Sequence, residues 1–161
     1  MIIDSARAFI AAILFSCLTA SPAIAETQRK PTPAMMAPIQ AIVTFVNTGS
    51  RIAEGTYAAG ATITDEFAPF HWTSGDAGKY WSTGFTKSNA AAKITKPYIV
   101  LRAATEYVTS ATRAYMVFPG TFKPLVDGKP FTETGYWTFV LVRDRAVWRV
   151  ASQAWAGVTF K

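Results

Sequence analysis

The chain has 161 residues, of which half are apolar, 14% are aromatic and only 16% are charged. Such a composition supplies enough apolar side chains for a core and excludes a largely disordered chain. The net charge is +6, yet no run of five or more basic residues occurs, so the sequence predicts no nucleic-acid interface.

Residues 1–25 are typical of a secretory signal peptide. Arg7 supplies a positive charge, residues 8–18 form an apolar stretch of 11 residues, and Ala23-Ile24-Ala25 is an A-x-A cleavage site. This stretch is too short to span a bilayer, which takes about 20 residues. We therefore expect a periplasmic or secreted chain that begins at Glu26 and has no integral membrane segment after cleavage.

The residues that most often bind metals are scarce. The only cysteine, Cys17, lies in the expected signal peptide, and the only histidine is His71. The mature chain then has no disulfide and no cysteine ligand. A single histidine and dispersed carboxylates do not supply three or four converging ligands. The sequence thus predicts neither a metal site nor another cofactor.

The N-terminal part of the mature chain is expected to be a leader followed by two helices. Residues 26–37 contain prolines with polar neighbours and predict a flexible leader. The next apolar residues follow the spacing of one helical face: Ile39, Ile42, Val43 and Val46. Ser50 is a possible cap for a second, short helix that runs to Tyr57.

The rest of the chain predicts a strand, a helix and a long sheet. Residues 61–67 alternate as in a strand, and Ser74 is the expected N-cap of a helix that runs to Ala92. Four later segments are rich in Val, Thr, Tyr, Phe and Trp: 98–108, 112–125, 131–143 and 146–156. Tight turns are expected at Asp127-Gly128 and at Arg143-Asp144-Arg145. Helices followed by consecutive strands predict one α+β domain over residues 38–157.

Three segments in this order resemble the NTF2-like superfamily, which includes SnoaL-like proteins and ketosteroid isomerases. Residues 57–63 (YAAGATI) are similar to the family's step from second helix to first strand. Residues 74–78 (SGDAG) are similar to the start of its third helix, and residues 147–150 (VWRV) to its closing strand. The resemblance implies a cone in which the N-terminal helices pack in a curved antiparallel sheet around a pocket.

The resemblance places Asp65 where the isomerases keep a general-base aspartate. A carboxylate in an apolar pocket loses hydration, so its pKa rises and it becomes a proton acceptor near neutral pH. His71 is a candidate proton shuttle. The simpler alternatives are that Asp65 caps a loop and that His71 bonds to backbone or water. The isomerase pattern is incomplete, because the matching turn of the first helix holds Ile42 and Val43, which cannot stabilise an enolate.

Aromatic side chains are the expected pocket wall. The predicted set is Phe67, Phe70, Trp72, Tyr80, Trp81, Tyr115, Trp137 and Trp155. Glu66 is expected on the opposite face of its strand from Asp65. The sequence leaves open which face of the sheet lines the pocket, since both faces carry large apolar groups. The resemblance implies a homodimer that forms through the outer face.

Three functions are compatible with these features. The first is binding of a small hydrophobic molecule in the cone of an exported protein. The second is a lyase or isomerase of a hydrophobic carbonyl or polycyclic substrate, with Asp65 as base and His71 or Tyr115 as its proton partner. The third is a non-catalytic dimerisation module, in which the cone is filled by its own side chains.

Overall fold

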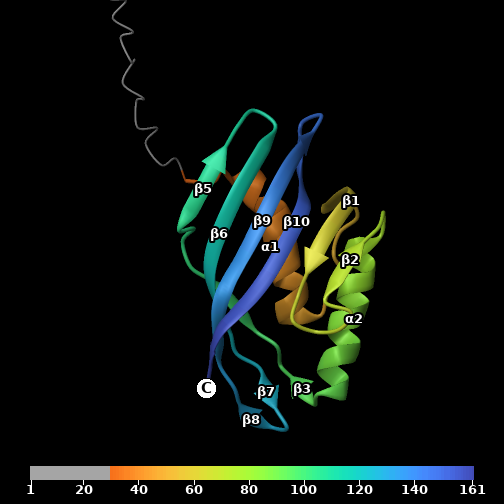
Figure 1. Cartoon of the computed structure of the whole chain (residues 1–161), viewed down its shortest axis with the longest axis vertical. Helices are drawn as coiled ribbons and strands as arrows, with labels where there is room; N and C mark the ends of the chain where they lie inside the picture. The colour runs from red at the N-terminus through yellow and green to blue at the C-terminus, as the bar shows by residue number, and fades with distance from the viewer. Residues whose placement is uncertain (1–29) are drawn as a thin grey trace, which may run out of the picture.

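A computed structural model describes residues 30–161, so the predicted signal peptide and the first part of the leader lie outside the described residues. Two helices and two sheets form this region (Figure 1). The helices are α1 (Pro33–Thr48) and α2 (Ala77–Ala91). The large sheet contains β1 (Tyr57–Thr64), β2 (His71–Thr73), β4 (Ile99–Leu101), β5 (Glu106–Thr109), β6 (Arg113–Phe122), β9 (Glu133–Asp144) and β10 (Val147–Phe160). The small sheet contains β3 (Ile94–Thr95), β7 (Leu125–Val126) and β8 (Lys129–Pro130).

Helix α1 begins inside the segment expected to be a leader. Thr32 is its N-cap, and the Thr32 hydroxyl accepts a hydrogen bond of 3.3 Å from the Met35 backbone N–H. Pro33 follows at the first helical position, where its missing N–H costs nothing. The predicted extended leader is therefore wrong for residues 33–37. The predicted apolar face of this helix is buried, which confirms the spacing argument.

The short helix expected from Ser50 to Tyr57 does not form. Residues 50–56 are a loop, in which Gly55 has a φ of 77°, a left-handed conformation that interrupts a helix. The Thr56 carbonyl instead accepts a hydrogen bond of 2.9 Å from the Val150 backbone N–H. Strand β1 thus begins at residue 57 and pairs with β10 in parallel.

Helix α2 starts at Ala77, two residues later than predicted from an N-cap at Ser74. Asp76 occupies the N-cap position, and its side chain makes no capping hydrogen bond. The Ser74 hydroxyl accepts a hydrogen bond of 3.2 Å from the Asp76 backbone N–H instead. Ser74 therefore organises the turn before the helix rather than the first helical turn.

An antiparallel meander of β6, β9 and β10 forms the centre of the large sheet, as predicted. The expected strand 98–108 is divided into β4 and β5, and both pair with β6. The segment 112–125 is divided into β6 and β7, and the turn at Asp127-Gly128 joins β7 to β8. With helices packed on a mixed sheet, the predicted α+β class is confirmed.

Burial distinguishes the two faces of the sheet. The odd-numbered residues of β9 from Glu133 to Leu141 are buried, and so are the even-numbered residues of β6 from Ala114 to Gly120. This buried surface, which we call the inner face, forms one core with α1. Helix α1 lies behind β9 and β10 in Figure 1, and α2 stands beside β1 and β2.

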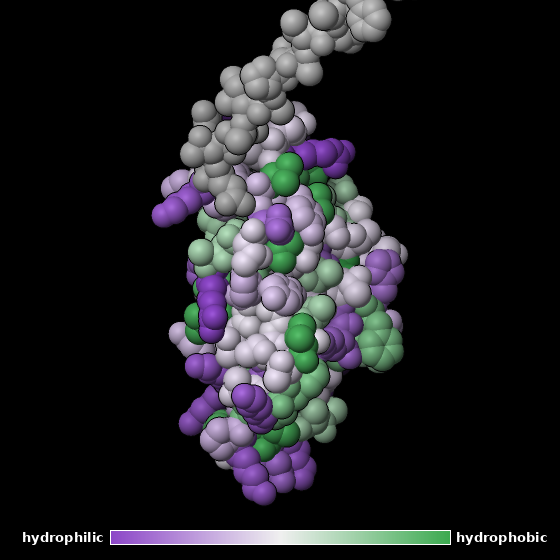
Figure 2. Space-filling model, turned by 60° about the vertical axis from the view of Figure 1, so that its left-hand side comes forward, coloured by the Kyte–Doolittle hydropathy of each residue, from purple (hydrophilic) through white to green (hydrophobic). Residues whose placement is uncertain are grey.

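The opposite, outer face carries partly exposed residues such as Tyr115 and Tyr136. Figure 2 brings the β5 and β6 side of the molecule forward and shows hydrophobic residues as separate patches among hydrophilic ones. Homodimerisation through this face stays a prediction. Neither helix in residues 30–161 has the length and apolar character needed to cross a membrane.

Candidate functional site

A cavity of about 170 Å³ lies at the end of the cone where α2 faces the start of β9. Its walls come from the loop after β1, from α1 and α2, and from several strands of both sheets. The aromatic lining residues are Phe67, Trp81, Phe85, Phe122, Trp137 and Trp155. The charged lining residues are Asp65, Glu66 and Glu133. The cone is therefore not filled by its own side chains at this end.

Asp65 is held at the cavity by hydrogen bonds to both of its carboxylate oxygens. It follows the last residue of β1 and is half-buried. The Trp81 indole N–H donates to Oδ2 over 2.7 Å, and the Glu66 backbone N–H donates to Oδ1 over 2.8 Å. Burial raises the pKa of Asp65 to about 6, although both hydrogen bonds oppose this rise by stabilising the ionised form.

Glu133, the first residue of β9, is a second acid at the same cavity. Its exposed fraction is 7%, and the Trp155 indole N–H donates to Oε1 over 2.5 Å. Burial raises the pKa of Glu133 to about 7, and the nearby carboxyls of Glu66 and Asp65 add to the rise. Each of the two acids thus accepts a hydrogen bond from a tryptophan indole, Asp65 from Trp81 and Glu133 from Trp155.

Glu66 completes a group of three carboxyls. The Gly157 backbone N–H donates to Glu66 Oε1. A Cβ at position 157 would collide with the side chains of both Glu66 and Glu133, so only glycine lets these two carboxyls approach the same point of β10. Within residues 30–161, no group of His, Cys, Asp or Glu side chains is arranged to hold a metal ion.

The prediction that Asp65 and Glu66 face opposite sides is wrong. Strict alternation holds only within a strand, and β1 ends at Thr64. In the loop that follows, both acids line the cavity.

Three tryptophan rings form a row from α2 to the large sheet: Trp81 on α2, Trp137 on β9 and Trp155 on β10. The centroids of Trp81 and Trp137 are 6.4 Å apart, and those of Trp137 and Trp155 are 6.0 Å apart. The Trp81 and Trp155 indoles donate to carboxylates, whereas two buried donors, Trp137 Nε1 and Gln153 Nε2, have no hydrogen-bond partner within residues 30–161. A buried donor left unpaired is uncommon in proteins, because its lost hydration is not replaced.

Five of the residues predicted for the site meet at the cavity: Asp65, Phe67, Trp81, Trp137 and Trp155. Trp72 lies in the core behind them, with its ring centroid 5.0 Å from that of Phe67, and does not line the cavity. Thus four of the aromatic residues predicted for the wall line the cavity, and they come from the loop after β1, α2, β9 and β10.

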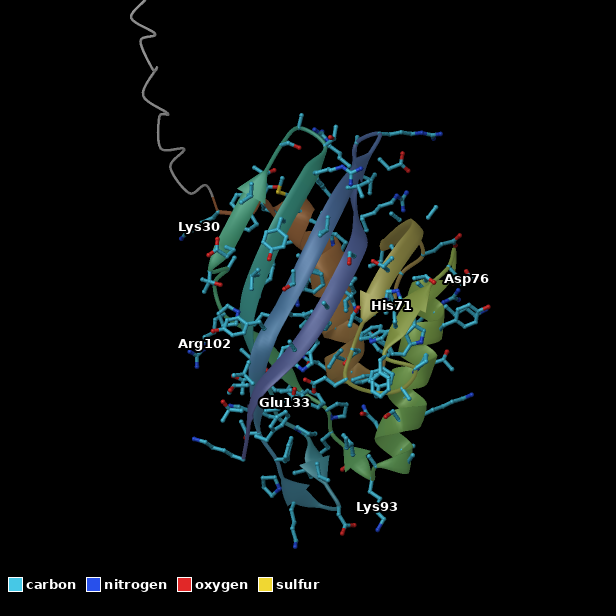
Figure 3. All side chains as sticks on the ribbon, in the orientation of Figure 1. Lys30, His71, Asp76, Lys93, Arg102 and Glu133 are labelled. Carbon is cyan, nitrogen blue, oxygen red and sulfur yellow. The ribbon has the colours of Figure 1, made fainter. Side chains whose placement is uncertain are left out.

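The other four predicted residues lie away from the cavity. Phe70 and Tyr80 are 59% and 55% exposed, and Tyr115 lies on the outer face of β6. His71 is exposed on β2, with Nδ1 3.4 Å from the Thr64 hydroxyl oxygen. Figure 3 shows His71 on β2 and Glu133 at the lower end of β9. Neither His71 nor Tyr115 lines the cavity with Asp65.

The sequence reasoning missed Glu133 and Glu66. A signal for Glu133 was present, because it shares odd numbering along one strand with Trp137, Phe139 and Leu141. An acid in register with a large apolar series is expected to face the core. The signal for Glu66 was absent, since its position depends on where β1 ends.

Comparisons with known proteins identify the fold but no close relative. No protein-family model matches the chain, and no curated protein matches it. The hexachlorocyclohexane dehydrochlorinase LinA-type3 from Novosphingobium barchaimii LL02 is a similar solved structure, with a TM-score of 0.67 and 11% identity. That alignment covers 80% of this chain and 86% of the other.

Two further structures agree. An NTF2-like superfamily protein from Salmonella enterica has a TM-score of 0.61 at 12% identity, over 76% of this chain and 87% of its own. An uncharacterised protein with a cystatin-like fold from Caulobacter vibrioides has a TM-score of 0.62 at 23% identity, over 78% and 88%. At these identities the similarity establishes the architecture, and the chain has the NTF2-like cone fold.

Proposed function

We propose that the protein binds a small organic molecule in the cavity between Asp65 and Glu133. The observation that carries this proposal is an unfilled, aromatic-lined space next to the hydrophobic core, with three carboxyls in its wall.

The size of the cavity limits the ligand. At about 170 Å³ it is close to the ~150 Å³ apolar cavity in another protein that holds benzene. Typical pockets for drug-sized ligands have volumes of roughly 300–1,000 Å³. The space therefore holds one ring or a compact branched group, and a larger molecule would extend through its open side.

Filling the cavity should weaken binding. Ser88 lines it from α2 and is half-buried, whereas Thr83 on the same helix is exposed and outside the lining. We expect uncharged single-ring molecules (benzene, phenol, cyclohexanone) to bind wild type and Thr83→Leu saturably, and Ser88→Leu at least tenfold more weakly, because the leucine occupies the ligand volume. Tryptophan fluorescence and ligand-detected NMR measure this. Equal binding by Ser88→Leu would place the ligand elsewhere.

A second candidate function, proton transfer, is favoured by the two raised pKa values. Burial raises the pKa of Asp65 to about 6 and that of Glu133 to about 7, so both carboxyls change their charge close to neutral pH. A general base and a general acid are then present in one cavity. One structural neighbour is a dehydrochlorinase, so the fold can carry an enzyme.

A simple carbon acid tests the base directly. In 5-nitrobenzisoxazole, a carboxylate removes the ring C–H proton, the electron pair forms a nitrile, and the N–O bond breaks to give a coloured phenolate. We expect wild type to accelerate this elimination with a rate that rises as pH passes about 6, where Asp65 ionises. Asp65→Asn should return the rate to the solution background, whereas Glu106→Gln, an exposed acid on β5, should not. An unchanged rate in Asp65→Asn excludes this role.

A further inference from the structure

The charge of the cavity is opposite to that of the chain. The chain has 16 basic and 10 acidic residues, a net charge of +6. Three of the acids nevertheless line this one cavity, and none of the lining residues within residues 30–161 is Lys, Arg or His. Neither ion pair found within residues 30–161 involves these three carboxyls, and the local field favours a positively charged occupant.

The aromatic walls suit the same occupant. Trp81, Trp137 and Trp155 present three indole rings around the cavity, and Phe67 and Phe85 lie beside them. The negative face of an aromatic ring attracts cations, tryptophan most strongly, and cages of such rings recognise quaternary ammonium groups. Within the described residues 30–161 the carboxyls are not arranged as metal ligands, so the aromatic walls favour an organic cation.

We propose that the ligand is a compact organic cation, a protonated amine or a quaternary ammonium ion, bound between the tryptophan rings and the carboxyls. The inference rests on the proposed function, because it names the class of molecule that occupies the same cavity.

Binding of a cation should depend on pH. The titratable groups around the site are Asp65 and Glu66 in the loop after β1, Glu133 on β9, and Tyr57 on β1, whose phenol donates to Gln153 Oε1. A cation stabilises the ionised carboxyls and therefore releases protons when it binds at neutral pH. Its affinity should rise from pH 5 to pH 8, whereas that of an uncharged molecule of the same shape should not.

Three probes of nearly the same shape separate charge from size: choline, its uncharged isostere 3,3-dimethylbutan-1-ol, and the anion 3,3-dimethylbutanoate. We expect calorimetry on residues 26–161 at pH 8 to show choline binding about tenfold or more tighter than the alcohol, with the anion weakest. The choline affinity should fall at pH 5. Glu133→Gln should lose most of the preference for choline, and Glu106→Gln should retain it.

The outcomes distinguish the two proposals. Equal or tighter binding of the alcohol overturns the cation proposal and leaves the cavity as a binding site for uncharged molecules. Failure of all three probes, while the uncharged rings bind, overturns the cation proposal in the same way. Failure of the rings and of all three probes overturns both. Circular dichroism of Glu133→Gln verifies that it is folded, so a lost preference reports charge.

Discussion

Trp81→Ala is expected to lower the free energy of unfolding by about 3–5 kcal/mol, as for other buried Trp to Ala changes. The Trp81 side chain is 1% exposed and contacts Phe45, Phe85 and Trp137 at ring-centroid distances of 5.5, 5.8 and 6.4 Å. Its removal leaves a cavity that joins the existing one and deprives Asp65 of its indole donor. Urea denaturation measures the loss. Phe70→Ala, at a position 59% exposed, should cost less than ~0.5 kcal/mol and serves as control.

Trp81→Phe separates the packing role of Trp81 from its hydrogen bond. Phenylalanine retains most of the ring contacts but cannot donate to Asp65 Oδ2. We expect a loss of about 1–3 kcal/mol, the cost of a buried acceptor left without its donor. The pKa of Asp65 should rise further, because the Trp81 hydrogen bond lowers it. A Trp81→Ala variant as stable as wild type would show that α2 does not rest on this residue.

Neutralising either buried acid is expected to stabilise the protein at pH 8 by about 2–3 kcal/mol, since each pKa unit corresponds to ~1.4 kcal/mol. Asp65→Asn and Glu133→Gln each keep an oxygen that accepts the tryptophan N–H while removing a charge from the cavity. The gain should disappear near pH 4. Urea denaturation at both pH values measures it, with Glu106→Gln as the control for net charge.

The sign follows from the direction of the pKa changes. Burial raises the pKa of Asp65 from 3.8 to about 6 and that of Glu133 from 4.5 to about 7. The folded state therefore binds these protons more tightly than the unfolded chain does. The associated stability is fully present below about pH 4 and is lost as pH rises through 6 and 7. Lower stability of both variants than of wild type at pH 8 would show that the folded state stabilises the ionised carboxylates. That result would contradict the poor solvation of Asp65 and Glu133.

A protein that retains such destabilising groups is expected to use them. Proteins commonly give up stability at functional sites, where strained or poorly solvated groups are retained for binding or catalysis. The trade-off would be evident if Asp65→Asn and Glu133→Gln are more stable than wild type but bind choline more weakly or no longer catalyse the elimination. The same two substitutions thus link the stability prediction to the proposed functions.

The parts of the fold that depend on local pattern could be predicted from the sequence. The apolar spacing of Ile39, Ile42, Val43 and Val46 identified the buried face of α1, and turn residues identified the meander. The same reasoning failed at Ser50, because the left-handed Gly55 and a hydrogen bond from distant β10 determine that loop. Strand pairing over such a sequence separation leaves no local signal.

The candidate site could be predicted only in part for a similar reason. Asp65 was found through a family resemblance, and Trp137 through the composition of its strand. The second acid, Glu133, required the face of the sheet to be known, and its contact with Glu66 depends on the absence of a side chain at Gly157. Register irregularities in β10, on either side of Trp155, also shift which of its residues share a face.

The central claim is that Asp65 and Glu133 face one apolar cavity and share its poor solvation. The most direct test is a ¹³C NMR titration of their side-chain carboxyl carbons in residues 26–161 between pH 3 and pH 9, assigned with Asp65→Asn and Glu133→Gln. We expect midpoints near 6 for Asp65 and near 7 for Glu133. Midpoints of about 4 for both carboxyls, the range of well-solvated Asp and Glu, would contradict the account.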